Sequence, residues 1–326
     1  MNVASHSDAA RRANAAVEPD EVHQRWMAAM RSGDFEAAWK QTDRLEIPRR
    51  RTRRQESVAR PAWHLVWDGS SFAGKRVLVR CEHGLGDTLQ FIRYVPLVRE
   101  LARSVTVLAQ PALLPLLGLM PEFGEVRDAW SGEAFPEADV EIECMELAYA
   151  FRSTVETLPR RVPYLSPAAI RAAGPPAGLP GAGKRVGLIW ASSSWDSSRS
   201  LAPGDLMPLS NVPAVSWFSL QQGPEADEAG SAPIPICPLS SRTRGTLEAA
   251  AAMLELDLII TVDTMAAHLA GALGRPVWLL LREDADWRWM RDRRDCPWYP
   301  TMRIFRRTAR GGWQRVMDEV ATSLRG

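Results

Sequence analysis

The stretch LIITVDTMAAHLAGALGRPVWLL (258–280) decides the fold of this 326-residue chain. An apolar, β-branched run of strand length ends at Asp263-Thr264, and residues with helical spacing follow at once over 265–274. A second apolar run then occupies 276–281. Two buried strands joined by a helix predict a βαβ crossover, the unit from which parallel sheets are built.

The same alternation extends along most of the chain. Strands are expected at 76–81, 104–110, 138–145, 185–191, 214–221, 258–263 and 276–281, and helices at 87–102, 111–120, 202–210, 246–257 and 265–274. The Pro- and Gly-rich segment 166–184 interrupts the alternation and suits an interdomain linker. Two such halves predict an α/β protein with two Rossmann-like, doubly wound domains that face a cleft.

The domain boundaries are placed where the pattern changes. Residues 1–19 have no apolar periodicity and are expected to form a disordered tail. The rest divides into a helical hairpin with a basic linker (20–60), a first Rossmann-like domain (61–173), a linker (174–184), a second Rossmann-like domain (185–310) and a terminal helix (311–326).

The hairpin is expected on both sides of Gly33-Asp34, where apolar residues have helical spacing. The turn GDFEAAW (33–39) resembles that of a tetratricopeptide repeat. One such hairpin cannot bury its own apolar face, so we expect it to pack against the domains that follow. The run PRRRTRRQ (48–55) has no interleaved aromatic residues, which favours a solvated linker over a nucleic-acid or lipid site.

The composition narrows the class of protein. Hydrophobic residues make up 46% and charged residues 24%, and the net charge of +1 gives no general attraction to nucleic acid. The longest apolar runs have strand length, and the N-terminal residues lack the apolar core of a signal peptide. Four scattered cysteines without a CxxC pair, and five histidines, argue against a zinc site. We therefore expect a cytoplasmic location with reduced thiols.

The end of the strand at Asp263-Thr264 is a candidate anion site. Parallel sheets bind ligands at the carboxyl ends of their strands. The N–H groups of the helix N-terminus and the Thr264 hydroxyl would suit a pyrophosphate, and His268 lies one turn further on. In the alternative interpretation, Asp263 is only an N-cap and His268 packs against a neighbouring helix. Spacing alone leaves both open.

The stretch CEHGLGDTLQFIRYVP (81–96) raises the same question at an earlier strand end. Gly84 and Gly86 would permit a tight turn, and Asp87 would cap the helix. Alternatively, the turn faces a substrate, the two glycines let a sugar approach the backbone, and Asp87 takes a proton. His83 could contact an acceptor or a phosphate, or simply lie on the surface.

Three segments resemble the ADP-heptose:lipopolysaccharide heptosyltransferase family (glycosyltransferase family nine): VDTMAAHLAGALGRPVWLL (262–280), HGLGDTLQFIRYVPLV (83–98) and DWRWMRDRRDCPWYPTMRIFRR (286–307). The likeness covers roughly residue 60 to the end and is greatest for the branch commonly fused to tetratricopeptide repeats. It implies a GT-B fold, in which the first domain binds the acceptor and the second the nucleotide-sugar.

The resemblance also implies roles for single residues. Asp263, Thr264 and His268 match the residues that hold the donor pyrophosphate, and Asp87 matches the proposed general base. The loop ASSSWDSSRSLAP (191–203) matches the segment where the heptosyltransferases offer a lysine to the donor phosphates. The nearest cation here is Arg199, whose guanidinium can hold a phosphate with different geometry. The donor sugar is therefore not fixed by the resemblance.

Two weaker sets of candidates complete the site. Gln221 and Gln222 end a strand of the second domain, where a nucleotide base or ribose would lie, although a simple loop role is the alternative. The aromatic cluster could shape a sugar surface, but interdomain packing is favoured; it comprises Trp287, Arg288, Trp289, Trp298 and Tyr299. We identify no DxD pair at a strand end next to a loop of small residues, and expect no metal and no cofactor.

The sequence therefore predicts an inverting, metal-independent glycosyltransferase. Its donor would be a nucleotide-diphospho-sugar such as ADP-heptose. Its acceptor would be a glycan or lipid-linked molecule of the cell envelope, or a protein, and the chain could contact the inner membrane peripherally. Two alternatives remain: a GT-B epimerase or hydrolase acting on the nucleotide-sugar, and a non-catalytic nucleotide-sugar-binding scaffold that docks through the hairpin.

Overall fold

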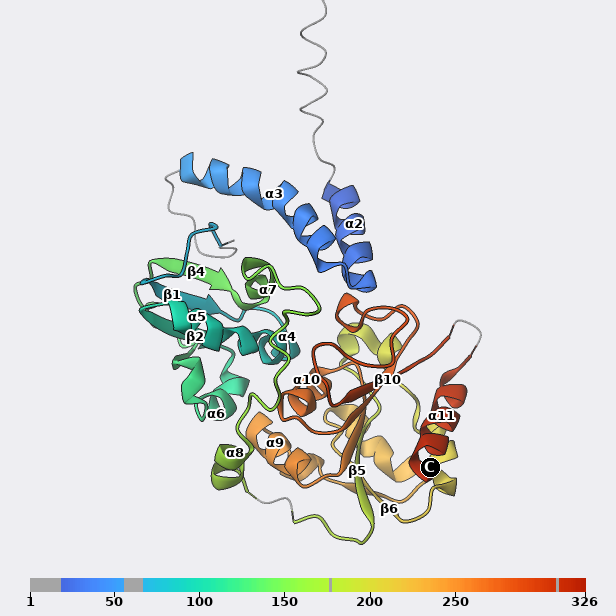
Figure 1. Ribbon diagram of the computed structural model, residues 1–326. Coiled ribbons are helices and arrows are strands. Elements are labelled where there is room, and N and C mark those ends of the chain that lie inside the picture. The colour runs from blue at the N-terminus through green and yellow to red at the C-terminus, as the bar shows by residue number, and fades with distance from the viewer. Residues whose placement is uncertain (1–18, 56–66, 176–177, 309–310) are drawn as a thin grey trace, which may run out of the picture.

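The computed structural model describes residues 19–55, 67–175, 178–308 and 311–326 (Figure 1). The expected disordered tail lies outside these residues except for Pro19, as do parts of both expected linkers. The described chain forms two parallel sheets, each flanked by helices, and a helical hairpin that lies against both of them (Figure 1).

The first sheet contains β1 (Arg76–Arg80), β2 (Ser104–Ala109), β3 (Glu125–Asp128) and β4 (Val140–Glu143). The order is β3-β2-β1-β4, and the strand pairs are parallel. The central strand β1 is buried along almost its whole length, as expected for a strand covered on both faces. The strand order reverses between β1 and β4, so this point at the carboxyl edge is where a ligand is expected.

The second sheet contains β5 (Lys184–Ile189), β6 (Val215–Ser219), β7 (Ile236–Pro238), β8 (Leu258–Val262), β9 (Val277–Leu281) and β10 (Met302–Arg306). Its order is β10-β9-β8-β5-β6-β7, again parallel. This is the strand order of a doubly wound sheet: from β5 the chain first adds strands on one side and then on the other, so the strand order reverses between β5 and β8. The predicted architecture of two doubly wound domains is confirmed.

The helices of the two domains are α4 (Leu85–Phe91), α5 (Val95–Leu101), α6 (Leu114–Leu117), α7 (Leu147–Ala150), α8 (Pro167–Ala173), α9 (Thr246–Leu254), α10 (Met265–Ala272) and α11 (Trp313–Arg325). The helix expected over 87–102 starts earlier and is broken by a 3₁₀ helix at Ile92–Tyr94. Pro96 lies in the first turn of α5, where its missing N–H is tolerated, so α5 restarts there. None of the described helices is long and apolar enough to cross a membrane.

Two other expectations differ from the structure. The segment 166–184 is not entirely a linker, because α8 forms at its start, where the Ser166 hydroxyl accepts a hydrogen bond from the Ala169 N–H. The helix expected over 202–210 is a 3₁₀ helix, Pro203–Asn211, with Pro208 inside it. A proline removes an N–H and blocks regular α-helical hydrogen bonding, which explains the change.

The N-terminal hairpin consists of α2 (Pro19–Ser32) and α3 (Phe35–Gln55). Gly33 adopts a φ of 81° in the turn between them, a left-handed conformation that suits glycine. Because α3 continues through Gln55, the basic run 48–55 is helical and is not the linker that the sequence predicted.

The hairpin bridges the two domains (Figure 1). In α3, the Trp39 indole N–H donates to the Ser153 carbonyl of the first domain at 2.7 Å. In α2, the Trp26 ring packs edge-on against Trp287 of the second domain, with centroids 5.2 Å apart. The hairpin thus buries its apolar face against both domains. This was expected, because a single hairpin of this kind cannot bury that face by itself.

Trp39→Phe is expected to lower the free energy of unfolding by about 1–3 kcal/mol, because the Ser153 carbonyl loses its donor and the smaller ring leaves a void. Thermal and denaturant unfolding measure this. Trp130→Phe is the matched control, since Trp130 is 70% exposed and should change little. Equal effects of the two substitutions would contradict the bridging role of α3.

Candidate active site

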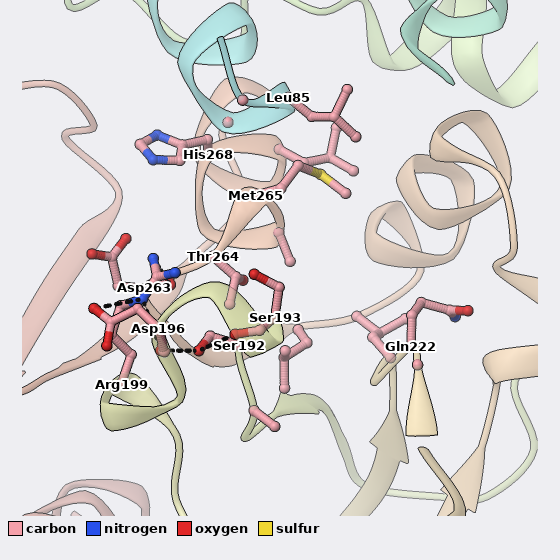
Figure 2. A pocket seen from close by; sticks show the side chains of 18 of the residues that line it. Leu85, Ser192, Ser193, Asp196, Arg199, Gln222, Asp263, Thr264, Met265 and His268 are labelled. Carbon is pink, nitrogen blue, oxygen red and sulfur yellow. Dashed lines mark hydrogen bonds and ion pairs between the residues drawn. The ribbon is translucent and has the colours of Figure 1, made fainter. Parts of the chain in front are cut away.

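A cavity of about 1380 Å³ lies between the domains at the carboxyl edges of both sheets. From the first domain it is lined by the turn 84–87, and from the second by the loop after β5, the end of β6 and the N-terminus of α10 (Figure 2). The strand-order reversal of the second sheet, between β5 and β8, faces this cavity. It has the size and position of a ligand site in a doubly wound fold.

The N-terminus of α10 opens into the cavity. Thr264 is the N-cap residue and has an extended backbone, and among the described side chains none caps this helix end. Its first amide groups and the Thr264 hydroxyl therefore face the cavity, where the helix dipole favours an anion. Asp263 is 8% exposed, and burial raises the pKa of its carboxyl. This shift acts in the direction that reduces repulsion of an anion nearby.

Arg199 lies beside this helix end (Figure 2). Its Nη1 donates to the Asp263 carbonyl at 2.9 Å, and its Nε lies 3.6 Å from Asp196 Oδ2. Arg282, which directly follows β9, makes an ion pair of 3.1 Å with the same Asp196 oxygen and also lines the cavity. The structure thus brings the predicted cation to the predicted anion site and adds a second one. The position of Arg282 just past a strand end was the signal that could have identified it.

His268 is buried within the interface between α10 and α4. Its Nδ1 is hydrogen-bonded to the Tyr299 hydroxyl at 3.0 Å, and its ring stacks on Trp289 with centroids 5.1 Å apart. Burial, with smaller contributions from neighbouring arginines, lowers the pKa of His268 well below its usual value. His268 therefore lines the cavity as a neutral ring, in the packed arrangement that was one of its two interpretations.

Gly86 is explained by the same interface. A Cβ at this position would lie 2.9 Å from His268 Cδ2, closer than real side chains approach. Gly86 is thus required because α4 and α10 pack closely. Gly86 also lines the cavity, so its expected role beside a sugar stays a prediction.

Asp87 uses both of its carboxylate oxygens. Oδ2 accepts a hydrogen bond of 3.0 Å from the N–H of Gly84, the N-cap residue of α4, which is the contact that the third helical residue makes in a capping box. Oδ1 lies 2.6 Å from Arg288 Nη2, which belongs to the second domain. The predicted cap is therefore present, and an ion pair across the cleft, which the sequence did not predict, is added to it.

Arg288 belongs to the aromatic cluster that the sequence analysis singled out. Its Nη1 pairs with Asp286 Oδ1 at 2.8 Å, and its guanidinium lies 4.5 Å from the centre of the Trp287 ring. Trp298 and Tyr299 are fully buried, which agrees with the interdomain packing that was favoured for this cluster. Arg288 differs from them because it reaches the cavity.

The two glutamines behave differently from each other. The Gln221 Oε1 accepts from the backbone N–H groups of Trp190 and Ala191, at 3.1 and 2.9 Å. Its Nε2 donates to the Ala191 and Gln222 carbonyls, so this side chain holds the loop after β5 and is not available to a nucleotide. Gln222 is exposed at the cavity wall, where its Nε2 donates to Thr243 Oγ1 at 2.8 Å.

His83 and Gly84 are neighbours in the turn before α4, but they line different cavities. Gly84 lines the cavity as the extended N-cap of α4. His83, with its side chain 58% exposed, faces a second cavity, where its Nε2 lies 4.0 Å from Glu143 Oε1. Across the described residues, no group of three or more His, Cys, Asp or Glu side chains is arranged to hold a metal ion.

Comparison with known proteins gives one curated relative and several solved structures. No family model matches the chain. Protein FlbA of Caulobacter vibrioides is 29% identical over 287 residues, which are 79% of this chain and 48% of FlbA. The chain thus spans about half the length of this relative.

The solved structures share the fold. E. coli ADP-heptose LPS heptosyltransferase II aligns with a TM-score of 0.56 at 15% identity, over 76% of this chain and 98% of that one. E. coli heptosyltransferase WaaC with ADP-2-deoxy-2-fluoro heptose aligns with a TM-score of 0.52 at 13% identity, over 76% and 98%. The GT-B fold expected from the family resemblance is confirmed.

Gly86→Ala is expected to destabilise the protein by about 1–3 kcal/mol, because the new methyl group would force α4 away from His268. Thermal unfolding measures the change. The matched control is Gly204→Ala, where a Cβ would meet no described atom within 4 Å. Indistinguishable melting temperatures for the two variants would contradict the close packing of α4 on α10.

The neutral state of His268 predicts acid sensitivity. Since the folded state lowers its pKa, the unfolded chain binds the proton more readily. The stability that His268 contributes is therefore present above its ordinary pKa of about 6.5 and falls at lower pH, by at most about 1.4 kcal/mol per pH unit. Melting temperatures recorded from pH 7.5 to 5.5 should fall less steeply in His268→Gln. Parallel curves would show that folding does not lower the pKa of His268.

Proposed function

We propose that this chain is an inverting, metal-independent glycosyltransferase that moves a sugar from a nucleotide-diphospho-sugar to an acceptor hydroxyl. One observation carries the proposal: Asp87 of the first domain faces the cavity opposite the uncapped N-terminus of α10 and Arg199 of the second. A carboxylate and an anion site on opposite sides of one cleft are the parts that such a transfer needs.

The donor diphosphate is assigned to the N-terminus of α10. There the Thr264 hydroxyl, the first amide groups of the helix and Arg199 would contact its oxygens. The nucleoside would then extend toward Gln222, whose exposed amide is suited to a base or ribose. ADP-heptose is the first donor to test, because the fold neighbour WaaC was solved with an ADP-heptose analogue.

The chemical step forms one bond and breaks another. The acceptor oxygen attacks the anomeric carbon from the face opposite the diphosphate, and its proton passes to Asp87. The bond between the anomeric carbon and the phosphate oxygen breaks, and its electron pair leaves with the nucleoside diphosphate. The products are the glycosylated acceptor and the diphosphate, and Asp87 then returns its proton to solvent.

Arg288 has to move or share its contacts during this step. Its Nη2 contacts the Asp87 Oδ1 that would accept the proton. A diphosphate in the same cavity is a competing anion for this guanidinium, and an arginine fork suits a phosphate. Donor binding would therefore release the base and place a positive charge beside the leaving group, without a metal ion.

The proposal also implies a cellular compartment for the reaction and a class of acceptor. Nucleotide-sugars are cytoplasmic substrates, so the protein would act in the cytoplasm on a cell-envelope or protein acceptor. Treatment with EDTA should leave its activity unchanged, because arginines and a helix dipole take the role of the metal. Activity that is lost with EDTA and restored by a divalent ion would contradict this part of the proposal.

A panel of nucleotide-diphospho-sugars, including ADP-heptose, tests the donor site directly. The true donor should raise the melting temperature by mass action, and product analysis with and without acceptor separates transfer from hydrolysis or epimerisation. If no member of the panel stabilises the protein, the donor assignment is wrong. Binding without turnover on any acceptor would instead favour a non-catalytic scaffold.

The substitution Asp87→Asn distinguishes the helix-capping role of Asp87 from its proposed role as the general base. The amide oxygen can still accept the Gly84 hydrogen bond, but the side chain cannot take a proton. We expect a folded protein that binds donor and loses on the order of 10²–10⁴-fold in kcat.

Asp205→Asn is the matched control for this experiment. Asp205 makes the same kind of hydrogen bond at the start of its helix, accepting from the Ala202 N–H at 2.9 Å, but it lies outside the cavity lining. It should retain full turnover. Near-normal kcat in Asp87→Asn would rule out Asp87 as the base.

A further inference from the structure

The N-terminal hairpin contributes to the wall of the cavity between the domains. Met27 and Arg31 lie one turn apart on the same side of α2, and both line this cavity. The Arg31 carbonyl accepts a hydrogen bond of 2.7 Å from the Arg291 N–H, which holds the end of α2 against the loop that follows β9. Arg31 therefore belongs to the candidate active site, although it lies outside both Rossmann-like domains.

The Arg31 guanidinium has hydrogen-bonding capacity to spare. Its ion pair joins Nη2 to Asp284 Oδ1 at 3.0 Å, and its Nε is buried with no hydrogen-bond partner in the described part of the chain. The Asp284 side chain is 71% exposed, and an ion pair with such an exposed carboxylate is weakened by water and salt. An arginine with unused donors at a cavity wall is a candidate ligand contact.

The arginines on this side of the cavity outnumber the carboxylates that they share. Each of two carboxylates contacts two guanidiniums: Asp196 those of Arg199 and Arg282, and Asp284 those of Arg31 and Arg291. The first pair of arginines lies by the N-terminus of α10, where the donor diphosphate is assigned. The second pair leaves a positive charge that the diphosphate does not use.

Arg31 is connected to the segment that carries the other groups of the proposed reaction. The Asp284 carbonyl accepts from Arg282 Nε at 2.9 Å, and four residues further along the same loop Arg288 pairs with Asp87. In the proposed reaction both sugars meet between the diphosphate and Asp87, so a substituent of either can point toward this loop. Since Arg288 already contacts two carboxylates, Arg31 is the better placed of the two arginines to accept a further anion.

We propose that Arg31 forms a second anion subsite of the cavity, and that it binds a carboxylate or phosphate group on one of the two sugars that react there. This inference rests on the proposed function and specifies the class of its substrates. A planar guanidinium can hold either anion through two parallel hydrogen bonds, which a neutral hydroxyl group cannot match. The hairpin then selects the substrate in addition to bridging the domains.

Two matched pairs of sugar nucleotides test the inference without turnover. UDP-glucuronate is compared with UDP-glucose, and GDP-mannuronate with GDP-mannose, so that the members of a pair differ only in a carboxylate. If the anion belongs to the donor sugar, calorimetry should show the acidic member of at least one pair binding about tenfold more tightly than the neutral one. This preference should weaken at high salt.

The acceptor arm uses mannose 6-phosphate and mannose, each added to protein saturated with ADP. If the anion belongs to the acceptor, the phosphorylated sugar should bind about tenfold more tightly than mannose. A preference in either arm supports the inference and identifies the sugar that carries the anion. Equal affinities within every pair of both arms would overturn it.

Three variants assign the preference to Arg31. Arg31→Gln should reduce it to about twofold or less and leave the affinity of the neutral ligands within about twofold. Arg31→Lys should retain part of the preference, because it keeps the charge and loses the planar fork. The matched control is Arg25→Gln, which should change nothing, because Arg25 lies on the same helix, pairs with Glu21 and is outside the cavity lining. A preference that survives Arg31→Gln would overturn the proposal.

A purely structural role of Arg31 gives a different result. If Arg31 only held the loop through Asp284, its substitution by glutamine would weaken acidic and neutral ligands alike. Such a uniform loss would also overturn the inference.

ADP binding, measured in the same preparations, separates the two proposals. Normal ADP binding with no preference for an anionic sugar would refute this inference and leave the proposed glycosyltransferase intact. If neither ADP nor any of the sugar nucleotides binds, the donor assignment is wrong and the inference fails with it.

Discussion

The ion pair between Asp87 and Arg288 is the contact on which the arrangement of the cleft depends. It joins the first turn of α4 to the loop before β10, at 2.6 Å, with the arginine side chain only 10% exposed. A charge pair shielded from solvent in this way interacts more strongly than one on the surface, but each partner is costly to leave alone. The two domains are consequently held at the separation that allows α4 to contact α10 through Gly86 and His268. The N-terminal hairpin reinforces this separation because it binds Ser153 on one side and Trp287 on the other.

The same carboxylate therefore has a structural role and a proposed chemical role. Asp87 caps α4, pairs with the second domain and, in our proposal, takes the acceptor proton. These roles are compatible because they use different oxygens: Oδ2 stays with the Gly84 N–H, whereas Oδ1 is held by a cation that another anion can attract. A diphosphate at the α10 N-terminus is such an anion. In this way the presence of donor and the availability of the base would be coupled through Arg288.

Much of the fold could be predicted from the sequence, and the exceptions share a cause. The central strands β1, β5 and β8 are continuous apolar runs, because parallel strands covered on both faces exclude polar side chains. The three strands that the sequence analysis missed, β3, β7 and β10, are three of the four edge strands of the two sheets. Edge strands have one neighbour and tolerate short length, proline and charge, so EVRD and ICP carry little periodic signal. The single helix predicted over 87–102 is instead divided, because Pro96 starts a new helix, α5; this proline was visible in the sequence.

The sequence by itself determined the α/β class, the order of the elements and the strand ends at which Asp87, Asp263 and Thr264 lie, because hydrophobic periodicity and turn residues act over a few positions. Only the tertiary structure decided what these residues meet. The engagement of Gln221 with the backbone after β5, the pairing of Asp87 with Arg288, and the contact of Arg31 in the hairpin with Asp284 after β9 all join segments far apart in the chain. Such contacts depend on how two sheets and a hairpin pack in three dimensions, and no local pattern in the sequence encodes them.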